Sequence, residues 1–234
     1  MLLPDSIQIG TIDYCNRKCP WCPESYLDKK PDQLMDMDTY KHILNDLSEC
    51  KYNGRLHLYL MGEPLCDPRI REMISMARKQ FPDNIIFLST NGDKLNGLES
   101  VKSLIDSGLT WLAISDYDGQ ERFQKYVTEF YPHVTITSME ALKPTFYNRG
   151  GKIDVESTYK MSACEWVFSK AYINYKGEVI LCCSDYEYEV VFGSMLEKSF
   201  KDIYNSKDYR LYRKAHMTGR GKELPLCDKC NRIA

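Results

Sequence analysis

Three cysteines lie close together directly after a short apolar run. Cys15, Cys19 and Cys22 are spaced C-x3-C-x2-C, and the run from Ile7 to Ile12 before them is typical of a strand. Three thiolates on one loop can hold three irons of a [4Fe–4S] cluster and leave the fourth iron without a protein ligand. An open coordination position marks a site of chemistry more often than a structural site. A zinc loop is the alternative, although zinc loops favour C-x2-C pairs and four ligands.

The size and composition of the chain limit the other possibilities. Its 234 residues, 43% of them hydrophobic, allow one large domain or one domain with an appendage. The formal net charge of −2 gives no general attraction to nucleic acid or to anionic membranes. Several basic residues do gather near the C-terminus, where a solvated helix face and tail explain them better than a nucleic-acid site. They are Lys207, Arg210, Arg213, Lys214, Arg220 and Lys222.

The cysteine content indicates the compartment. The first residues, Met1 to Asp5, have neither the basic nor the long apolar region of a signal peptide, and no apolar run approaches the length of a membrane span. Ten cysteines in a chain of this kind are better explained by metal or cluster ligation than by disulfides, because the cytosol keeps thiols reduced. We therefore expect a cytoplasmic protein with no nucleic-acid partner and no membrane contact.

Strands and helices alternate through the first part of the chain. Strands are expected at residues 6–12, 55–60, 85–88, 111–115 and 134–138, with helices between them, including 68–79, 98–107 and 120–130. This alternation indicates a parallel sheet with right-handed crossovers. The sequence therefore predicts an α/β fold, a partial (β/α)6 TIM-like barrel, with its site at the carboxyl ends of the strands.

Distinctive segments follow the ends of these strands. They are the three-cysteine loop, Gly62-Glu63-Pro64, Ser89-Thr90-Asn91-Gly92 and Ser115-Asp116. Since the carboxyl ends of parallel strands lie at one edge of a sheet, these segments should converge there. Within residues 55–60, strict alternation also places Arg55, His57 and Tyr59 on one face of the strand.

The pattern changes from about residue 143. A β-hairpin is expected from 171–175 to 178–181, and a helix from about 200 to 216. Four cysteines, Cys164, Cys182, Cys227 and Cys230, can bind one zinc ion or fully ligate a [4Fe–4S] cluster, and spacing alone does not separate the two. Cys183, next to Cys182, is an alternative ligand. We expect a core domain over residues 1–152 and a small α+β domain over residues 153–234.

Together these motifs resemble the radical S-adenosylmethionine (SAM) enzymes that carry a SPASM or Twitch auxiliary-cluster domain. The resemblance is carried by the three-cysteine loop, by Gly62-Glu63-Pro64, by C-x12-G-x4-C from Cys164 to Cys182, and by the pair Cys227 and Cys230. With four cysteines instead of the seven of SPASM, the C-terminal part resembles the smaller Twitch form.

The resemblance implies two [4Fe–4S] clusters and SAM as cofactors. The implied ligands are Cys15, Cys19 and Cys22 for the first cluster, and Cys164, Cys182, Cys227 and Cys230 for the second. Trp21 would lie against the adenine, and the segment Gly62, Glu63, Pro64 would meet the SAM ammonium. Asn91 and Ser115 are the implied contacts to the ribose and carboxylate.

The resemblance also implies a reaction. An electron from a reductase or flavodoxin reaches the first cluster, SAM is cleaved to a 5′-deoxyadenosyl radical, and the radical takes a hydrogen atom from a small polar substrate, a sugar or aminocyclitol alcohol. The auxiliary cluster then accepts the second electron, which makes the protein a dehydrogenase. Arg149 is the candidate for substrate binding, and His57 and Tyr59 are candidates for binding or proton relay. Their ordinary interpretations are a surface arginine in a turn and hydrogen-bonded core side chains.

Several alternatives stay open. A peptide-modifying radical SAM enzyme, a glycyl-radical activase, or an epimerase with Cys66 or Cys183 as hydrogen donor would share much of this pattern. The first strand begins at about residue 6, which leaves no room for a leader-binding domain and favours a small-molecule substrate. A non-enzymatic iron–sulfur or zinc module for electron transfer or structure is disfavoured by the Gly62-Glu63-Pro64 segment, which such a role does not need.

Overall fold

The fold is built around one β-sheet. The computed structural model describes residues 2–157 and 160–233. The described residues form one eight-stranded sheet in the order β5-β4-β3-β2-β1-β6-β7-β8. The strands are β1 (Ser6–Ile9), β2 (Arg55–His57), β3 (Ile86–Thr90), β4 (Trp111–Asp116), β5 (Val134–Ser138), β6 (Lys170–Ile173), β7 (Glu178–Ile180) and β8 (Val191–Ser194). Strands β1 to β6 all pair in parallel, whereas β6, β7 and β8 pair antiparallel. The predicted α/β partial barrel with six parallel strands is confirmed.

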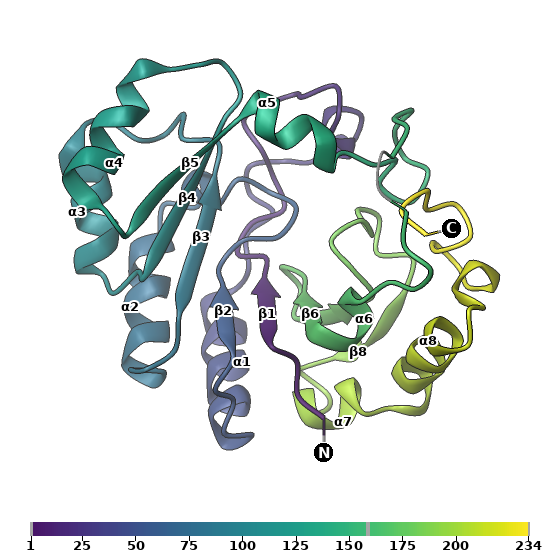
Figure 1. The fold of residues 1–234 in the computed structure, drawn as a ribbon. Coiled ribbons are helices and arrows are strands. Elements are labelled where there is room, and N and C mark those ends of the chain that lie inside the picture. Colours follow the sequence, from purple (N-terminus) through teal and green to yellow (C-terminus); the bar gives the residue numbers. More distant parts are fainter. Residues whose placement is uncertain (1, 158–159, 234) are drawn as a thin grey trace.

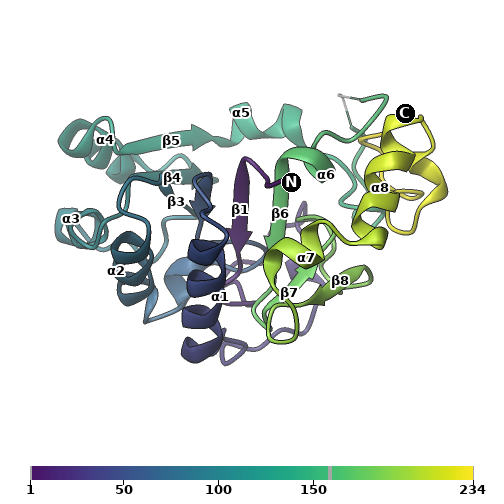
Figure 2. The same ribbon diagram turned by 90° about the horizontal axis from the view of Figure 1, so that it is seen from below.

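Helices cover the outer, convex face of the curved sheet. The α-helices are α1 (Met37–Glu49), α2 (Ile70–Gln80), α3 (Leu98–Asp106), α4 (Gln124–Phe130), α5 (Met139–Leu142), α6 (Trp166–Ser169), α7 (Phe200–Tyr204) and α8 (Lys207–Met217). The short 3-10 helices are η1 (Pro23–Ser25), η2 (Pro64–Cys66), η3 (Glu121–Phe123), η4 (Lys143–Thr145) and η5 (Gly221–Glu223). Figures 1 and 2 show α1, α2, α3 and α4 along that outer side. None of the helices of the described residues has the length and apolar character needed to cross a membrane.

The two faces of the sheet carry different side chains. Ile7, Leu88 and Ile114 point outward and are fully buried against the helices. Ser89 and Ser115, one position further along β3 and β4, face the inside of the curved sheet, where they line a cavity. Because successive side chains of a strand alternate between faces, one face supplies the core and the other supplies the site.

The second strand is shorter than its sequence pattern indicates. It ends at His57, although the Leu58 amide still donates to the Phe87 carbonyl at 3.0 Å. After His57 the chain leaves the strand, and Tyr59 and Leu60 both line the cavity at the carboxyl end of β2.

The predicted helix over residues 200–216 is wrong in one respect, because it is two helices. α7 ends at Tyr204, and Ser206 then caps α8, its hydroxyl accepting a hydrogen bond from the Tyr209 amide at 3.2 Å. A serine side chain that satisfies a free amide at a helix start competes with continuation of the helix before it.

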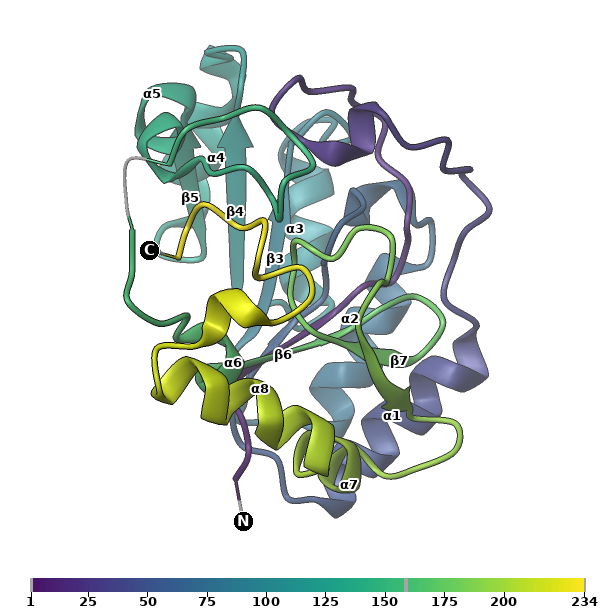
Figure 3. The ribbon, with the colours of Figure 1, turned by 90° about the vertical axis from the view of Figure 1, so that its right-hand side faces the viewer.

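The predicted hairpin is confirmed, and it joins the barrel. The Asn174 side chain accepts hydrogen bonds from the amides of Lys176 and Glu178, and Gly177 takes a positive φ of 80° in the turn. The first strand of the hairpin, β6, is also the sixth parallel strand, so the sheet continues into the C-terminal region. Figures 1 and 3 show α8 and the chain end on this side, at the opposite end of the molecule from α3 and α4. The domain boundary between residues 152 and 153 stays a prediction.

Candidate active site

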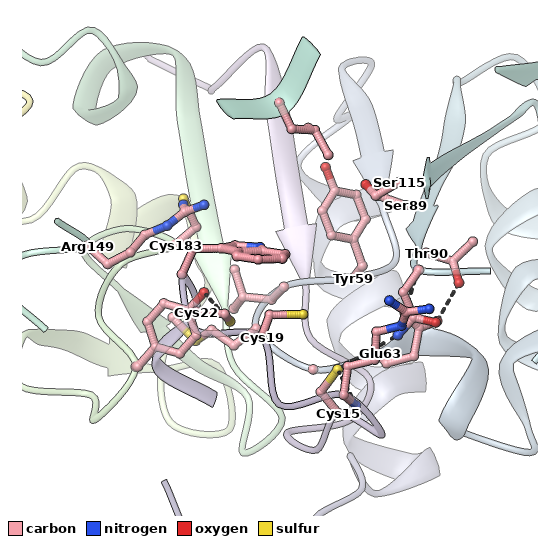
Figure 4. A pocket seen from close by; sticks show the side chains of 18 of the residues that line it. Cys15, Cys19, Cys22, Tyr59, Glu63, Ser89, Thr90, Ser115, Arg149 and Cys183 are labelled. Atoms are coloured by element: carbon pink, nitrogen blue, oxygen red, sulfur yellow. Dashed lines mark hydrogen bonds between the residues drawn. The ribbon is translucent and has the colours of Figure 1, made fainter. Parts of the chain in front are cut away.

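A cavity of about 360 Å³ lies inside the curved sheet, at the carboxyl ends of the parallel strands. It is lined by most of the site residues expected from the sequence: Cys15, Cys19, Trp21, Cys22, Tyr59, Gly62, Glu63, Asn91, Ser115 and Arg149. Figure 4 shows Arg149 and Cys183 on one side of this cavity and Glu63 and Thr90 on the other, with the three-cysteine loop between them. We call it the large cavity.

Two expected residues do not line the large cavity. Pro64 is buried and begins η2 behind the wall. The His57 ring packs on Phe87 with centroids 4.9 Å apart, and its Nδ1 lies 3.4 Å from the Tyr59 hydroxyl. Burial lowers the pKa of His57 to about 4, so the ring is neutral at pH 7. His57 therefore contacts Tyr59 and does not itself line the large cavity.

Glu63 joins the loops that follow β2 and β3. The residue is 4% exposed, and its carboxylate accepts hydrogen bonds from the Thr90 hydroxyl at 2.6 Å, the Asn91 amide at 2.8 Å and the Leu65 amide at 3.0 Å. Burial raises the pKa of Glu63 to about 6 in spite of these bonds, which favour the charged form. A cation bound in the large cavity would offset the burial and lower this pKa again.

The three-cysteine loop is tied to the loops after β3 and β4. Arg17 donates two hydrogen bonds of 2.6 Å to Asp93 and one of 2.5 Å to Asp118. The Arg17 guanidinium lowers the pKa of Asp93. Asn16 adds a bond of 2.9 Å to Asp93 and accepts one of 3.0 Å from the Asn91 side chain. No sequence motif marks the Arg17 contacts, because they join residues far apart in the chain.

The thiols of this loop suit a cluster that is open on one side. Cys15, Cys19 and Cys22 all face the large cavity. Burial raises the pKa of the Cys15 thiol to about 12 and of Cys19 to about 11. Thiolate ligation therefore requires a bound cationic group and releases protons. Three thiols on one wall, with free space in front of them, fit a [4Fe–4S] cluster that has one open iron.

Aromatic rings form the wall next to these thiols. Trp21 stacks on Phe146, with centroids 5.6 Å apart and planes at 18°, and its ring lies 5.7 Å from that of Tyr117. The aromatic surface at this wall therefore includes three rings, whereas the sequence indicated Trp21 alone. Tyr117 and Phe146 come from the loops after β4 and after α5, and no sequence motif marked them.

Arg149 brings a positive charge to the opposite wall. It has a positive φ of 49°, donates a hydrogen bond of 3.1 Å to the Tyr147 hydroxyl and lies over the Tyr147 ring. That hydroxyl is 2.6 Å from the Ser184 hydroxyl. The salt bridges found between described residues do not include Arg149. A guanidinium held by neutral partners beside a cavity is suited to an electron-rich ligand.

The other four expected cysteine ligands surround a second, smaller cavity. Cys164, Cys182, Cys227 and Cys230 line it together with apolar side chains such as Leu181 and Leu226. We call these four the C-terminal cysteine set. Four thiols around one cavity match the ligand set of a [4Fe–4S] cluster.

The neighbours Cys182 and Cys183 face different cavities. Cys182 belongs to the second cavity, whereas Cys183 lines the large cavity. Of the two thiols that the sequence left as alternative ligands, Cys182 has the position that suits ligation. Cys66 does not line the large cavity, and its thiol lies 3.6 Å from the Asn16 side-chain oxygen.

Comparison with known proteins identifies the chain's relatives. The model of the Radical SAM superfamily matches residues 9–148, more than half of the chain, and the SPASM model, an iron–sulfur cluster-binding domain, matches residues 164–231. The S-adenosyl-L-methionine-dependent 2-deoxy-scyllo-inosamine dehydrogenase of Niallia circulans is 24% identical over 233 residues, covering 97% of this chain and 93% of that protein. GTP 3′,8-cyclase of Clostridium perfringens is 33% identical over 125 residues, covering 52% of this chain and 37% of the cyclase.

The fold agrees with these relatives. The crystal structure of BtrN in complex with AdoMet and 2-DOIA superimposes with a TM-score of 0.87 at 25% identity, over 99% of this chain and 94% of that one. The anSMEcpe structure with bound AdoMet gives a TM-score of 0.60 at 15% identity, over 90% of this chain and 83% of that one. The two domain matches assign two iron–sulfur clusters and SAM as cofactors. The chain belongs to the radical SAM superfamily and is an oxidoreductase with a C-terminal iron–sulfur cluster-binding domain.

Proposed function

We propose that this protein oxidises a small polar alcohol, a sugar or an aminocyclitol, to a ketone by removal of one hydrogen atom, then one proton and one electron. The observation that carries the proposal is the placement of Cys182 and Cys183. Cys183 lines the large cavity and the adjacent Cys182 lines the second cavity, so the same stretch of chain separates the two. A radical formed in the large cavity would have an electron acceptor directly behind that wall.

The chain's own residues hold and orient the reactants. When bound, SAM and the first cluster supply the hydrogen-abstracting radical, and the second cluster supplies a one-electron acceptor. Trp21, with Phe146, offers a flat surface for an adenine, while Glu63 offers a carboxylate for an ammonium group. The enclosing walls exclude water and keep the reacting groups at near-attack distance.

Arg149 favours an oxygen-rich substrate. Loss of the hydroxyl proton from the alcohol radical places negative charge on its oxygen, and loss of one electron then gives the ketone. A guanidinium with neutral partners, next to Cys183, is placed to bind that oxygen and to stabilise this charge. The 2-deoxy-scyllo-inosamine dehydrogenase of Niallia circulans supports an aminocyclitol or a related polyol as the substrate class.

A second candidate is epimerisation, which the position of the Cys183 thiol favours. The substrate would lose a hydrogen atom to the radical and regain one from the Cys183 S–H on the other face. The resulting thiyl radical would need one electron and one proton to return to the thiol, and the reduced second cluster is the nearest source of that electron. This reaction leaves the substrate mass unchanged.

The electron donor is proposed to be a flavodoxin or a reductase of the cytoplasm. None of the ten cysteines, all of which lie in the described residues, is in a disulfide. This number of cysteines without disulfides is typical of a reducing compartment, where low-potential flavin donors operate.

The test is the product mass after anaerobic turnover with carbon-deuterated aminocyclitols and sugars. Loss of two hydrogens, with deuterium in 5′-deoxyadenosine, supports dehydrogenation. For the unlabelled substrate, unchanged mass in ordinary water and gain of one carbon-bound deuterium in D2O support epimerisation, and Cys183→Ala should then stop turnover. Deuterium transfer from a peptide, with no activity on any polyol, would overturn the small-molecule proposal.

A further inference from the structure

His216 is a buried histidine beside the C-terminal cysteine set, and neither the sequence motifs nor the proposed reaction accounts for it. It lies near the end of α8 and is 1% exposed. Its Nε2 is 3.6 Å from the Cys227 sulfur, and its Nδ1 is 3.3 Å from the Cys164 amide nitrogen. The ring therefore contacts two members of the set, one through its sulfur and one through its backbone.

The backbone contact determines which ring nitrogen carries the proton. An amide N–H can only donate, so Nδ1 must accept from Cys164 and cannot itself be protonated. The hydrogen of the neutral imidazole is therefore on Nε2, the nitrogen that faces the Cys227 sulfur. This tautomer makes His216 a hydrogen-bond donor to that sulfur.

The ring is also held from a third side. A Cβ atom built on Gly221 would lie 2.5 Å from both Nδ1 and Cε1 of His216. Only a glycine leaves room for the imidazole in this position. The other histidines, His42, His57 and His133, form hydrogen bonds with oxygen atoms, so the contact with sulfur distinguishes His216 within the described part of the chain.

We propose that His216 is a positioning residue that donates a hydrogen bond to the Cys227 sulfur and thereby raises the reduction potential of the second cluster. The proposal rests on the proposed function, in which that cluster accepts an electron. A reduced cluster carries one more negative charge, part of it on its sulfurs, and a donor aimed at a sulfur stabilises this form more than the oxidised one. Loss of the donor should make the cluster a poorer acceptor.

The experiment isolates the second cluster. In the background Cys15→Ala, Cys19→Ala and Cys22→Ala, only the C-terminal cysteine set remains to hold iron, and its midpoint potential can be followed by absorbance and EPR during a redox titration. Three variants are compared in this background: His216→Leu removes the donor, His216→Gln keeps an N–H, and His133→Leu is the matched control at an exposed histidine that contacts no cysteine. A separate variant, Gly221→Ala, keeps the imidazole but pushes it from its place.

We expect His216→Leu to lower the equilibrium constant for reduction of the cluster at least tenfold. For one electron this lowers the midpoint potential by about 59 mV. His216→Gln should recover part of this change, and His133→Leu should leave the potential as in the background. An unchanged potential in His216→Leu, with four irons still bound, would overturn the proposal. If His216→Leu cannot hold iron, Gly221→Ala decides: a lowered potential supports the hydrogen bond, and an unchanged one overturns it. A background protein without any iron would refute the second cluster, and with it both this inference and the proposed function.

Discussion

Arg17 and Asp93 are joined by two hydrogen bonds of 2.6 Å although 76 residues separate them in the chain. Their side chains are 17% and 25% exposed. The pair connects the three-cysteine loop to the loop after β3, so the position of the first cluster site depends on an ion pair that is not part of any cysteine motif.

Asp93→Asn should therefore weaken both the fold and the first site. The substitution keeps the shape of the side chain but removes the charge that Arg17 binds, and hydrogen bonds to charged groups contribute about 1.5–3 kcal/mol when well protected. Because the pair is partly exposed, we expect a loss of about 1–2 kcal/mol in the free energy of unfolding, measured by urea denaturation. Asp106→Asn, which breaks an exposed pair with Lys102, is the control and should change little. Equal effects of the two variants would show that the Arg17 pair has no special role.

SAM binding should weaken in acid through Glu63. Its pKa is raised to about 6, and a bound ammonium group favours the charged carboxylate. Below that pH the carboxyl group takes up a proton and loses its attraction for the cation, so SAM affinity should fall as the pH drops from 7 to 5. Glu63→Gln should bind SAM more weakly at pH 7 and show a flatter pH dependence. Equilibrium binding to the reconstituted protein measures both, and an equally steep dependence in the variant would contradict the assignment.

The first cysteine set should account for half of the iron. Reconstituted protein should hold about eight irons as two [4Fe–4S] clusters. Changing Cys15, Cys19 and Cys22 to Ala should remove about half of them and abolish SAM cleavage. Cys50→Ala, at the half-buried C-cap of α1, should change neither. Stoichiometric zinc without charge-transfer absorption would be the contrary result.

Cys182 and Cys183 provide a matched pair of variants. Cys182→Ala removes a thiol from the second cavity and should lower the iron content, because a four-thiol cluster site is left with three ligands. Cys183→Ala removes a thiol from the wall of the large cavity and should keep about eight irons. Iron analysis with Mössbauer or EPR spectroscopy measures the difference, and the reverse pattern would exchange the two roles.

Loss of the second cluster should uncouple SAM cleavage from product formation. In the variant Cys227→Ala with Cys230→Ala, the first site is intact, so 5′-deoxyadenosine should still form, while product falls at least tenfold because the acceptor is gone. Chromatography of both products from a soluble, folded variant is the measurement. Full turnover would rule out an electron-accepting role for the second cluster.

The sequence predicted the fold and the groups of cysteines for a physical reason. Strand and helix periods are local, and cysteines that share a cluster on one loop must be close in the chain. The alternation up to residue 138 and the loop of Cys15, Cys19 and Cys22 are patterns of this kind.

Features that depend on distant contacts could not be predicted. The pairing of Arg17 with Asp93, the stacking of Phe146 on Trp21 and the contact of His216 with Cys227 each need the folded chain. The opposite directions of Cys182 and Cys183 likewise follow from where the chain leaves β7. Even a local feature was missed at Ser206, because the helix pattern of residues 200–216 hid its capping role.

The place of β6 beside β1 has a consequence for how the chain folds. β1 lies in the interior of the sheet, with β2 on one side and β6 on the other. A chain cut after residue 152 would leave one side of β1 with unpaired backbone N–H and C=O groups, an exposed strand edge that promotes aggregation. The region that carries SAM chemistry therefore receives its sixth parallel strand from the C-terminal region, whose β6 covers this side of β1.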